Sequence, residues 1–241
     1  MLFMVMHKLT EDIEEGRPST KIVAEMGKFI GDAIAQGKFL NGAGLKRSAE
    51  RVRLRWKAGQ LQLTRGPKGE NELLAGFMHL KVKSMDEAIA WAKRIAEAEG
   101  GGDVELDVGP VVERWDLGLE PKPTGEVPLQ VLVLRKADAA SEGGVRPSAA
   151  AASRMQALKS EMEKAGVLLV AEGLKPSATG ARVRTLAGKP AWTDGPFAES
   201  KEMISGFSII KVDSLAEAKS WTERYADILG DIEVDVRELE A

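Results

Sequence analysis

The sequence has no cysteine and very few histidines. Among its 241 residues there are only two histidines, His7 and His79. The lack of cysteine excludes disulfides, thiolate nucleophiles and cysteine-ligated metals. Two histidines do not make a multi-histidine metal centre, and no glycine-rich phosphate-binding loop leads into an expected helix. We therefore expect neither a metal site nor a cofactor.

A strong excess of one charge and long apolar runs are also missing. Lys and Arg number 34 against 37 for Asp and Glu, which gives a net charge of −3. Proteins dedicated to nucleic acids are usually basic, so we expect no nucleic-acid partner. No apolar run approaches the ~20 residues that cross a bilayer, and residues 1–15 lack the basic start of a secretory signal. We expect a cytoplasmic protein without a membrane partner.

What the sequence does contain is an internal repeat. Residues 76–95 read GFMHLKVKSMDEAIAWAKRI, and residues 206–225 read GFSIIKVDSLAEAKSWTERY. The two segments are identical at 9 of 20 positions, whereas unrelated segments would share about one or two. The repeat therefore indicates a duplicated unit.

The duplication divides the chain into two homologous units, residues 1–110 and residues 128–241. The segment between them, residues 111–127, contains Pro121 and Pro123. Proline lacks an amide donor and disfavours regular structure, so we expect a semi-rigid linker here.

Both units show the same order of expected elements. Each opens with a short apolar run, at residues 2–6 and 129–134, that is typical of a buried strand. Alternating polar and apolar residues indicate further strands. Four serines fit helix N-caps, two of them in S-x-x-E capping boxes: Ser19, Ser84, Ser148 and Ser214. The resulting order, β-α-β-β-β-α-β, is a ferredoxin-like plan with one extra strand.

Two helices cover only one face of such a sheet, so the other face needs a partner. The two repeats can supply it to each other by packing their uncovered faces together about a pseudo-twofold axis. We expect an α+β fold in which two ferredoxin-like repeats form an intrachain pseudo-dimer. The chain is then either a monomer or a unit of a homodimer.

One motif in the second unit resembles a known family. Residues 193–202 read TDGPFAESKE and are followed by Gly206 and Phe207. This resembles the signature of the YCII-related family, also called the DGPF family. In the first unit the corresponding residues 65–70 read only RGPKGE. The resemblance implies the dimeric α+β barrel fold, which agrees with the plan expected from the repeat.

The resemblance also implies a range of functions. Most members of the family have no established activity. Some YCII relatives are small lyases, including dehydrochlorinases, that are thought to use a His–Asp pair. DGPF members are often encoded beside extracytoplasmic-function sigma factors, which implies a regulatory setting.

Three residues are candidates for catalysis. Asp194 of the signature is a candidate general base, although the sequence D-G-P is also typical of a turn. His7 ends the first expected strand and is a candidate proton shuttle. His79 lies where the second unit has Ile209, which favours a position in the core. Since the second unit has no histidine, a pair of Asp194 with His7 or His79 must form across the two units.

Other residues are candidates for binding a ligand. Residues 51–57 alternate basic and apolar side chains, which places four cations on one face of a strand. That face is either an anion-binding wall or a solvated hairpin face. Aromatic side chains beside Asp194 fit a pocket wall, and one further arginine takes the position of His7 in the second unit. The candidate ligand-binding residues are Arg53, Arg55, Arg135, Trp192 and Phe197.

Three functions remain open from the sequence. The first is binding of a small polar or anionic organic ligand in a cleft between the repeats, accessory to sigma-factor-linked regulation. The second is a lyase- or hydrolase-type enzyme that uses Asp194 with a histidine. The third is a purely structural or protein-interaction module whose cleft holds no ligand.

Overall fold

The two repeats fold into the same succession of strands and helices. The computed structural model describes residues 1–15, 18–70, 72–100, 102–197 and 201–240. The elements of the first repeat are β1 (Leu2–Lys8), α1 (Glu11–Glu15), α2 (Thr20–Ala35), β2 (Phe39–Gly44), β3 (Val52–Lys57), β4 (Gln60–Arg65), β5 (Leu74–Val82), α3 (Met85–Ala98) and β6 (Val104–Pro110). Those of the second are β7 (Leu129–Lys136), α4 (Ala139–Glu142), α5 (Ala149–Lys164), β8 (Leu168–Gly173), β9 (Ala181–Leu186), β10 (Lys189–Asp194), β11 (Ile204–Lys211), α6 (Leu215–Leu229) and β12 (Ile232–Glu238).

The four long helices begin at the serines expected from the sequence. In each case the serine hydroxyl accepts a hydrogen bond from the backbone amide three residues later, as at Ser214 with Glu217. The capping boxes differ from the expected form in one detail. The Glu217 carboxylate accepts from the amide of Asp213, one residue before the serine, instead of from the serine itself. The glutamate still occupies a free donor near the positive end of the helix.

Each of the two six-stranded sheets contains strands from both repeats. One sheet has the order β10-β9-β12-β1-β11-β2, and the other has the order β4-β3-β6-β7-β5-β8. All neighbouring strands are antiparallel, and β1 lies between β11 and β12 just as β7 lies between β5 and β6. The α+β pseudo-dimer is therefore confirmed. The expectation that each repeat would form its own sheet is wrong.

The exchange takes place after the second strand of each repeat. Short 3-10 turns, η1 (Ser48–Glu50) and η2 (Ser177–Thr179), lie between β2 and β3 and between β8 and β9. At these turns the chain passes from one sheet to the other. Each repeat thus contributes two strands to one sheet and four strands to the other.

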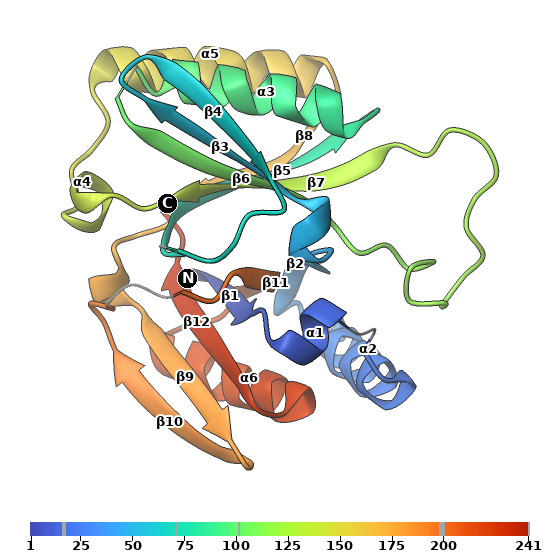
Figure 1. The fold of residues 1–241 in the computed structure, drawn as a ribbon. Coiled ribbons are helices and arrows are strands. Elements are labelled where there is room, and N and C mark those ends of the chain that lie inside the picture. The colour runs from blue at the N-terminus through green and yellow to red at the C-terminus, as the bar shows by residue number, and fades with distance from the viewer. Residues whose placement is uncertain (16–17, 71, 101, 198–200, 241) are drawn as a thin grey trace.

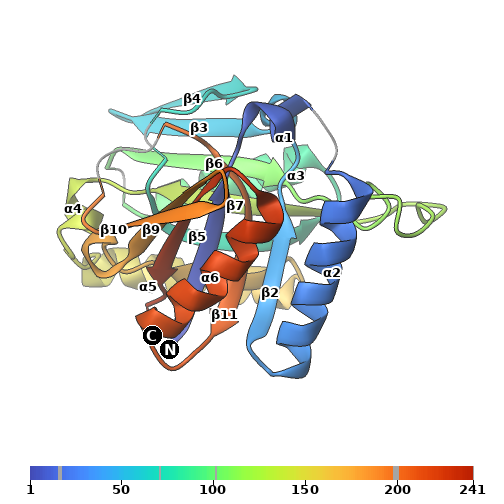
Figure 2. The same cartoon turned by 90° about the horizontal axis from the view of Figure 1, so that it is seen from below.

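The elements stack in four layers. Helices α3 and α5 cover one sheet, and helices α2 and α6 cover the other (Figure 1). Seen from below, α2 and α6 lie side by side across the outer face of their sheet (Figure 2). The chain termini come together, because the amide of Leu239 donates to the carbonyl oxygen of Leu2 at 3.0 Å. Residues 111–128 between β6 and β7 extend beyond the sheet edge as an irregular segment (Figure 1).

Three apolar clusters fill the spaces between these layers. Two lie between a sheet and its helices, and the third lies between the sheets. In the third cluster the rings of Phe77 and Phe207 have centroids 5.7 Å apart, and Met4 and Leu132 are fully buried. The centre of the interface between the sheets is therefore packed with side chains. No helix among the described residues has the length and apolar character needed to span a membrane.

Candidate functional site

The signature of the second repeat packs strand β10 against the turn η2. Gly195 lies so close to η2 that a Cβ atom would be 1.8 Å from the carbonyl oxygen of Ser177. The amide of Phe197 donates to Ser177 Oγ at 3.2 Å. A side chain at position 195 would therefore displace the turn, and the signature glycine serves the close approach of two backbones.

Phe197 connects this loop to the opposite sheet. Its buried ring packs with Leu73 and Ala137, which flank β5 and β7 of the other sheet. The guanidinium of Arg182 lies 4.6 Å from the ring centroid. An aromatic ring in this position forms both an apolar contact and a cation–π contact. Phe197 thus joins the two sheets at their margin.

The side chains of Asp194 and Trp192 both contact helix α6. Lys219 Nζ donates to Asp194 Oδ1 at 2.6 Å, and the side chain of Asp194 is 75% exposed. Trp192 Nε1 donates to Glu223 Oε1 at 2.6 Å, and Lys219 Nζ lies 5.1 Å from the centre of the indole. These contacts hold the hairpin β9–β10 to the helix at the protein surface.

The two histidines lie in different surroundings. His7 Nδ1 shares a 2.7 Å hydrogen bond with the hydroxyl of Tyr225. Burial lowers the pKa of His7, and the charge of Arg51 lowers it further, to about 4. The ring is therefore neutral at pH 7. His79 is buried between the sheets beside the ring of Phe207, and burial lowers its pKa as well. Across the described part of the chain, no contact joins Asp194 to either histidine.

A buried cluster of four charges lies on one sheet. Arg53 donates to both oxygens of Asp107 at 2.6 and 2.8 Å and to Glu72 at 2.8 Å. Lys136 pairs with Asp107 at 3.0 Å and also with Glu72. Burial alone raises the pKa of Asp107, but the hydrogen bond from Arg53 and the charge of Lys136 hold that pKa below its ordinary value. Two cations and two carboxylates balance each other here.

The other sheet repeats this cluster with one carboxylate fewer. Lys8 pairs with Asp235 at 2.9 Å, and Arg182 Nε donates to Asp235 at 2.6 Å. The repeat spacing aligns Glu72 with Glu202, but Glu202 is exposed and forms no ion pair among the described residues. Among the residues that the structure describes, the buried Lys8 therefore has one carboxylate partner where its counterpart has two.

A pocket of about 260 Å³ lies where the ends of β3, β6 and β7 meet. It is lined by both repeats, because β3 and β6 belong to the first and β7 to the second. Its size approaches the lower end of the range typical of small-molecule sites. The lining residues are Arg55, Trp56, Lys57, Asp103, Val104, Glu105, Arg135, Lys136, Ala137 and Asp138.

Most of the cations around this pocket are already paired with carboxylates. Arg55 Nε donates to Glu105 at 2.6 Å, and Arg135 Nε donates to Glu99 at 2.6 Å. Lys57 is the exception, because it has no ion pair among the described residues. The pocket wall therefore presents fixed ion pairs together with one exposed, unpaired ammonium group. In the part of the chain that the structure describes, no cluster of acidic or histidine side chains is arranged to hold a metal.

The structure places the predicted ligand-binding residues in different surroundings. The alternation in residues 51–57 does put the basic side chains on one strand face, but Arg53 is buried in an ion-pair network. Arg55 and Arg135 line the pocket, whereas Trp192 and Phe197 lie elsewhere. The two buried lysines were not among the residues predicted from the sequence. The sequence does contain a signal for them: Lys8 and Lys136 are the last residues of equivalent apolar strands, 128 positions apart.

Comparison with known families agrees with this arrangement. The YCII-related domain matches the chain twice, over residues 1–110 and over residues 129–238. The chain belongs to the YCII-related family. Its two YCII domains account for the tandem repeat and for the pseudo-dimer that they build. No curated protein and no solved structure gives a significant match to the chain.

Proposed function

We propose that this YCII protein binds a small organic molecule with an anionic group in the pocket at the ends of β3, β6 and β7. The observation that carries the proposal is the wall of this pocket, which combines an indole, an unpaired ammonium group and ordered guanidinium groups. Trp56 offers an apolar surface, and Lys57 offers a charge that has no carboxylate partner among the described residues. Such a mixture orients polar organic ligands.

The ordered arginines add geometric selectivity. Arg55 and Arg135 are held in place by their carboxylate partners, so their remaining N–H groups point in fixed directions. A ligand that carries an anion and a hydrogen-bond acceptor is favoured over a purely apolar one. We prefer binding to acid–base catalysis because Asp194 is held by Lys219 at the surface and His7 is held by Tyr225. A link to sigma-factor regulation stays a prediction from the family resemblance.

The proposal is tested by thermal denaturation with a panel of small carboxylates and organic phosphates. A true ligand at about ten times its Kd is expected to raise Tm by about 3–5 °C. The substitution Lys57→Gln removes the unpaired charge and is expected to abolish most of this rise. The matched control is Lys189→Gln, which removes a lysine from the hairpin of the other sheet and is expected to leave the rise intact.

Two results would contradict the proposal. One is a panel in which no compound changes Tm. The other is a rise that is equal in the wild type and in Lys57→Gln, which would place the ligand elsewhere on the protein.

A further inference from the structure

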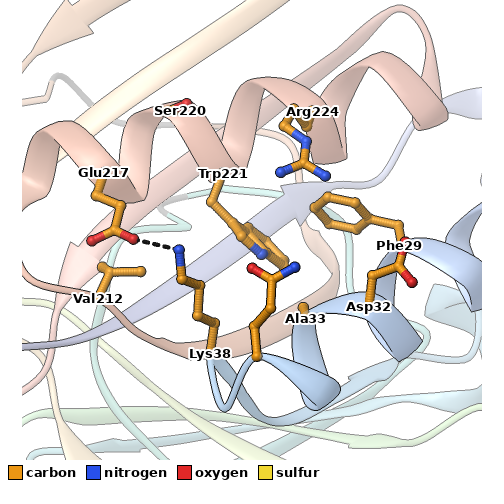
Figure 3. A pocket seen from close by; sticks show the side chains of 10 residues that line it. Phe29, Asp32, Ala33, Lys38, Val212, Glu217, Ser220, Trp221 and Arg224 are labelled. Atoms are coloured by element: carbon orange, nitrogen blue, oxygen red, sulfur yellow. Dashed lines mark hydrogen bonds and ion pairs between the residues drawn. The ribbon is translucent and has the colours of Figure 1, made fainter.

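A second, smaller pocket lies outside the sheets, between helices α2 and α6. Its volume is about 70 Å³, enough for a small ion rather than a metabolite. Phe29 and Ala33 of α2 line one side, and Trp221 and Arg224 of α6 line the other. In Figure 3 the indole of Trp221 projects from α6 toward α2, between Lys38 and Phe29.

A buried hydrogen-bond donor is left without an acceptor at this pocket. Trp221 is only 5% exposed, and its Nε1 has no hydrogen-bond partner in the described part of the chain. Buried donors in folded proteins are almost always paired. The indole cannot easily turn away, because Phe29 packs at 4.9 Å and Tyr225 stacks at 5.3 Å between ring centroids. The structure thus fixes a free N–H group in the pocket wall.

The pocket wall holds two cations, Lys38 and Arg224, and two carboxylates, Asp32 and Glu217, but their pairing leaves one cation aside. Lys38 pairs with Glu217 at 2.7 Å, and Lys28 pairs with Asp32 at 2.8 Å. Arg224 has no ion pair among the described residues, and its guanidinium lies 5.1 Å from the centre of the Phe29 ring. The pocket therefore combines an unsatisfied neutral donor with an unpaired guanidinium. Within the described ranges the buried indole lacks an acceptor and the exposed guanidinium is free to pair, so an anion can accept from both.

The equivalent space in the other half of the molecule is filled. There Met162, fully buried, stands in the position that Ala33 takes in α2. Arg94, the counterpart of Arg224, donates to both oxygens of Glu161 at 2.7 and 2.5 Å. The pocket between α2 and α6 thus coincides with two changes: alanine replaces methionine, and Asp32, which takes the place of Glu161, pairs with Lys28 instead of with the local arginine.

We infer that the pocket between α2 and α6 binds a small carboxylate anion such as acetate, which accepts hydrogen bonds from Trp221 Nε1 and from the Arg224 guanidinium. A carboxylate has two oxygens, so one can face the indole and the other the guanidinium. This site is separate from the one in "Proposed function", and it involves neither Lys57 nor Trp56. A ligand of so few atoms is expected to bind with a Kd of about 1–10 mM.

The experiment is a titration of the full chain with sodium acetate, followed by NMR of the five tryptophan indole N–H signals. Sodium chloride at matched ionic strength is the reference. The signal of Trp221, assigned by its loss in Trp221→Phe, is expected to shift with saturation. The signal of Trp91, its counterpart on α3, is expected to stay unchanged.

Two variants make the outcome decisive. Ala33→Met fills the pocket as Met162 fills the other half, and Arg224→Gln removes the cation; each is expected to raise the Kd for acetate at least about tenfold. Arg94→Gln is the matched control and is expected to leave the Kd unchanged. The inference is overturned if the Trp221 signal does not saturate with acetate, or if its shift persists in both Ala33→Met and Arg224→Gln.

Discussion

The two halves of the molecule, each a sheet with its pair of helices, follow one plan but fill equivalent positions differently. Between α3 and α5 a methionine closes the space that stays open beside Ala33 between α2 and α6. In the described part of the chain, the buried lysine of one charged cluster pairs with two carboxylates, and that of the other pairs with one. Equivalent positions therefore serve as internal controls for one another, because the backbone is shared and only the side chains change.

A second difference between the halves concerns an arginine that binds a backbone carbonyl oxygen. Both halves have this contact, but a different arginine makes it in each. Arg51 on one side donates from Nε to the carbonyl oxygen of Lys46 at 2.6 Å, and Arg237 on the other donates to that of Lys175 at 3.1 Å. Lys46 and Lys175 are equivalent in the repeat, but the two arginines are not, since Arg51 lies just before β3 and Arg237 lies in β12. Gly109 is the repeat equivalent of Arg237, and its lack of a side chain leaves room for the side chain of Arg51. Both halves therefore have a guanidinium that binds the equivalent carbonyl oxygen, although the two arginines do not occupy equivalent positions in the repeat.

The largest difference between the halves is expected from the buried acids. Asp235→Ala removes the carboxylate partner of Lys8 and is expected to cost about 4 kcal/mol of unfolding free energy. Asp107→Ala is expected to cost less, because Glu72 still pairs with Lys136. Urea denaturation measures both values. Equal costs would show that the extra carboxylate of the first cluster has no energetic weight.

Next in size is the exchange of side chains between the helix layers. Met162→Ala creates a cavity between α3 and α5 and is expected to destabilise the protein by about 3 kcal/mol. Ala33→Met adds a side chain where a pocket already exists and is expected to change stability by less than about 1 kcal/mol. The same denaturation experiment compares them. A large loss in Ala33→Met would mean that the pocket cannot accept the side chain that its counterpart holds.

The arginine exchange allows a double-mutant cycle. Gly109→Arg alone crowds Arg51, whose Cδ lies 3.3 Å from the position of a Cβ at 109, and is expected to cost about 2 kcal/mol. Adding Arg51→Gly converts this half to the pattern of the other and is expected to recover most of that loss. If the destabilisations of Gly109→Arg and Arg51→Gly simply add in the double variant, an arginine at position 109 cannot replace Arg51.

The smallest effect on the free energy of unfolding is expected when the pH is lowered. The pKa of His7 falls from 6.5 in the unfolded chain to about 4 in the fold, so the unfolded state binds the proton first as the pH drops. Stability from the neutral ring is complete above about pH 6.5 and is lost as the pH falls toward 4. Between pH 7 and pH 5.5 the loss is about 1 kcal/mol. His7→Gln is expected to reduce this pH dependence of the urea midpoint, and an unchanged dependence would contradict the assignment.

Much of the local structure could be read from the sequence, for identifiable reasons. The N-cap at Ser214 and the apolar stripe that follows it specify α6 without any tertiary information. The exchange of strands between sheets could not be read. β1 can pair with β5 and β6 of its own repeat or with β11 and β12 of the other, and these candidates have similar sequences. The choice depends on the path of the chain through η1, which carries no distinctive pattern.

The candidate sites were predictable only where period-two alternation decides the geometry. The strand that holds Arg55 revealed its basic face, and that residue lines the larger pocket. The small pocket could not be foreseen, because it depends on which side chain stands opposite Trp221 on another helix. Asp194 looked like a reactive group in sequence, and its exposure and its contact with Lys219 became visible only in three dimensions.

The exchange of strands between the repeats also determines when the protein can fold during its synthesis. Strand β12 follows the other strands of its sheet in the sequence and lies between β9 and β1, so that sheet cannot be completed until translation has reached Glu238. The apolar strand β1 is synthesised well before its partners β11 and β12, so it stays unpaired in the nascent chain until they appear. Two repeats that look like tandem domains in the sequence are thus committed to folding as one unit.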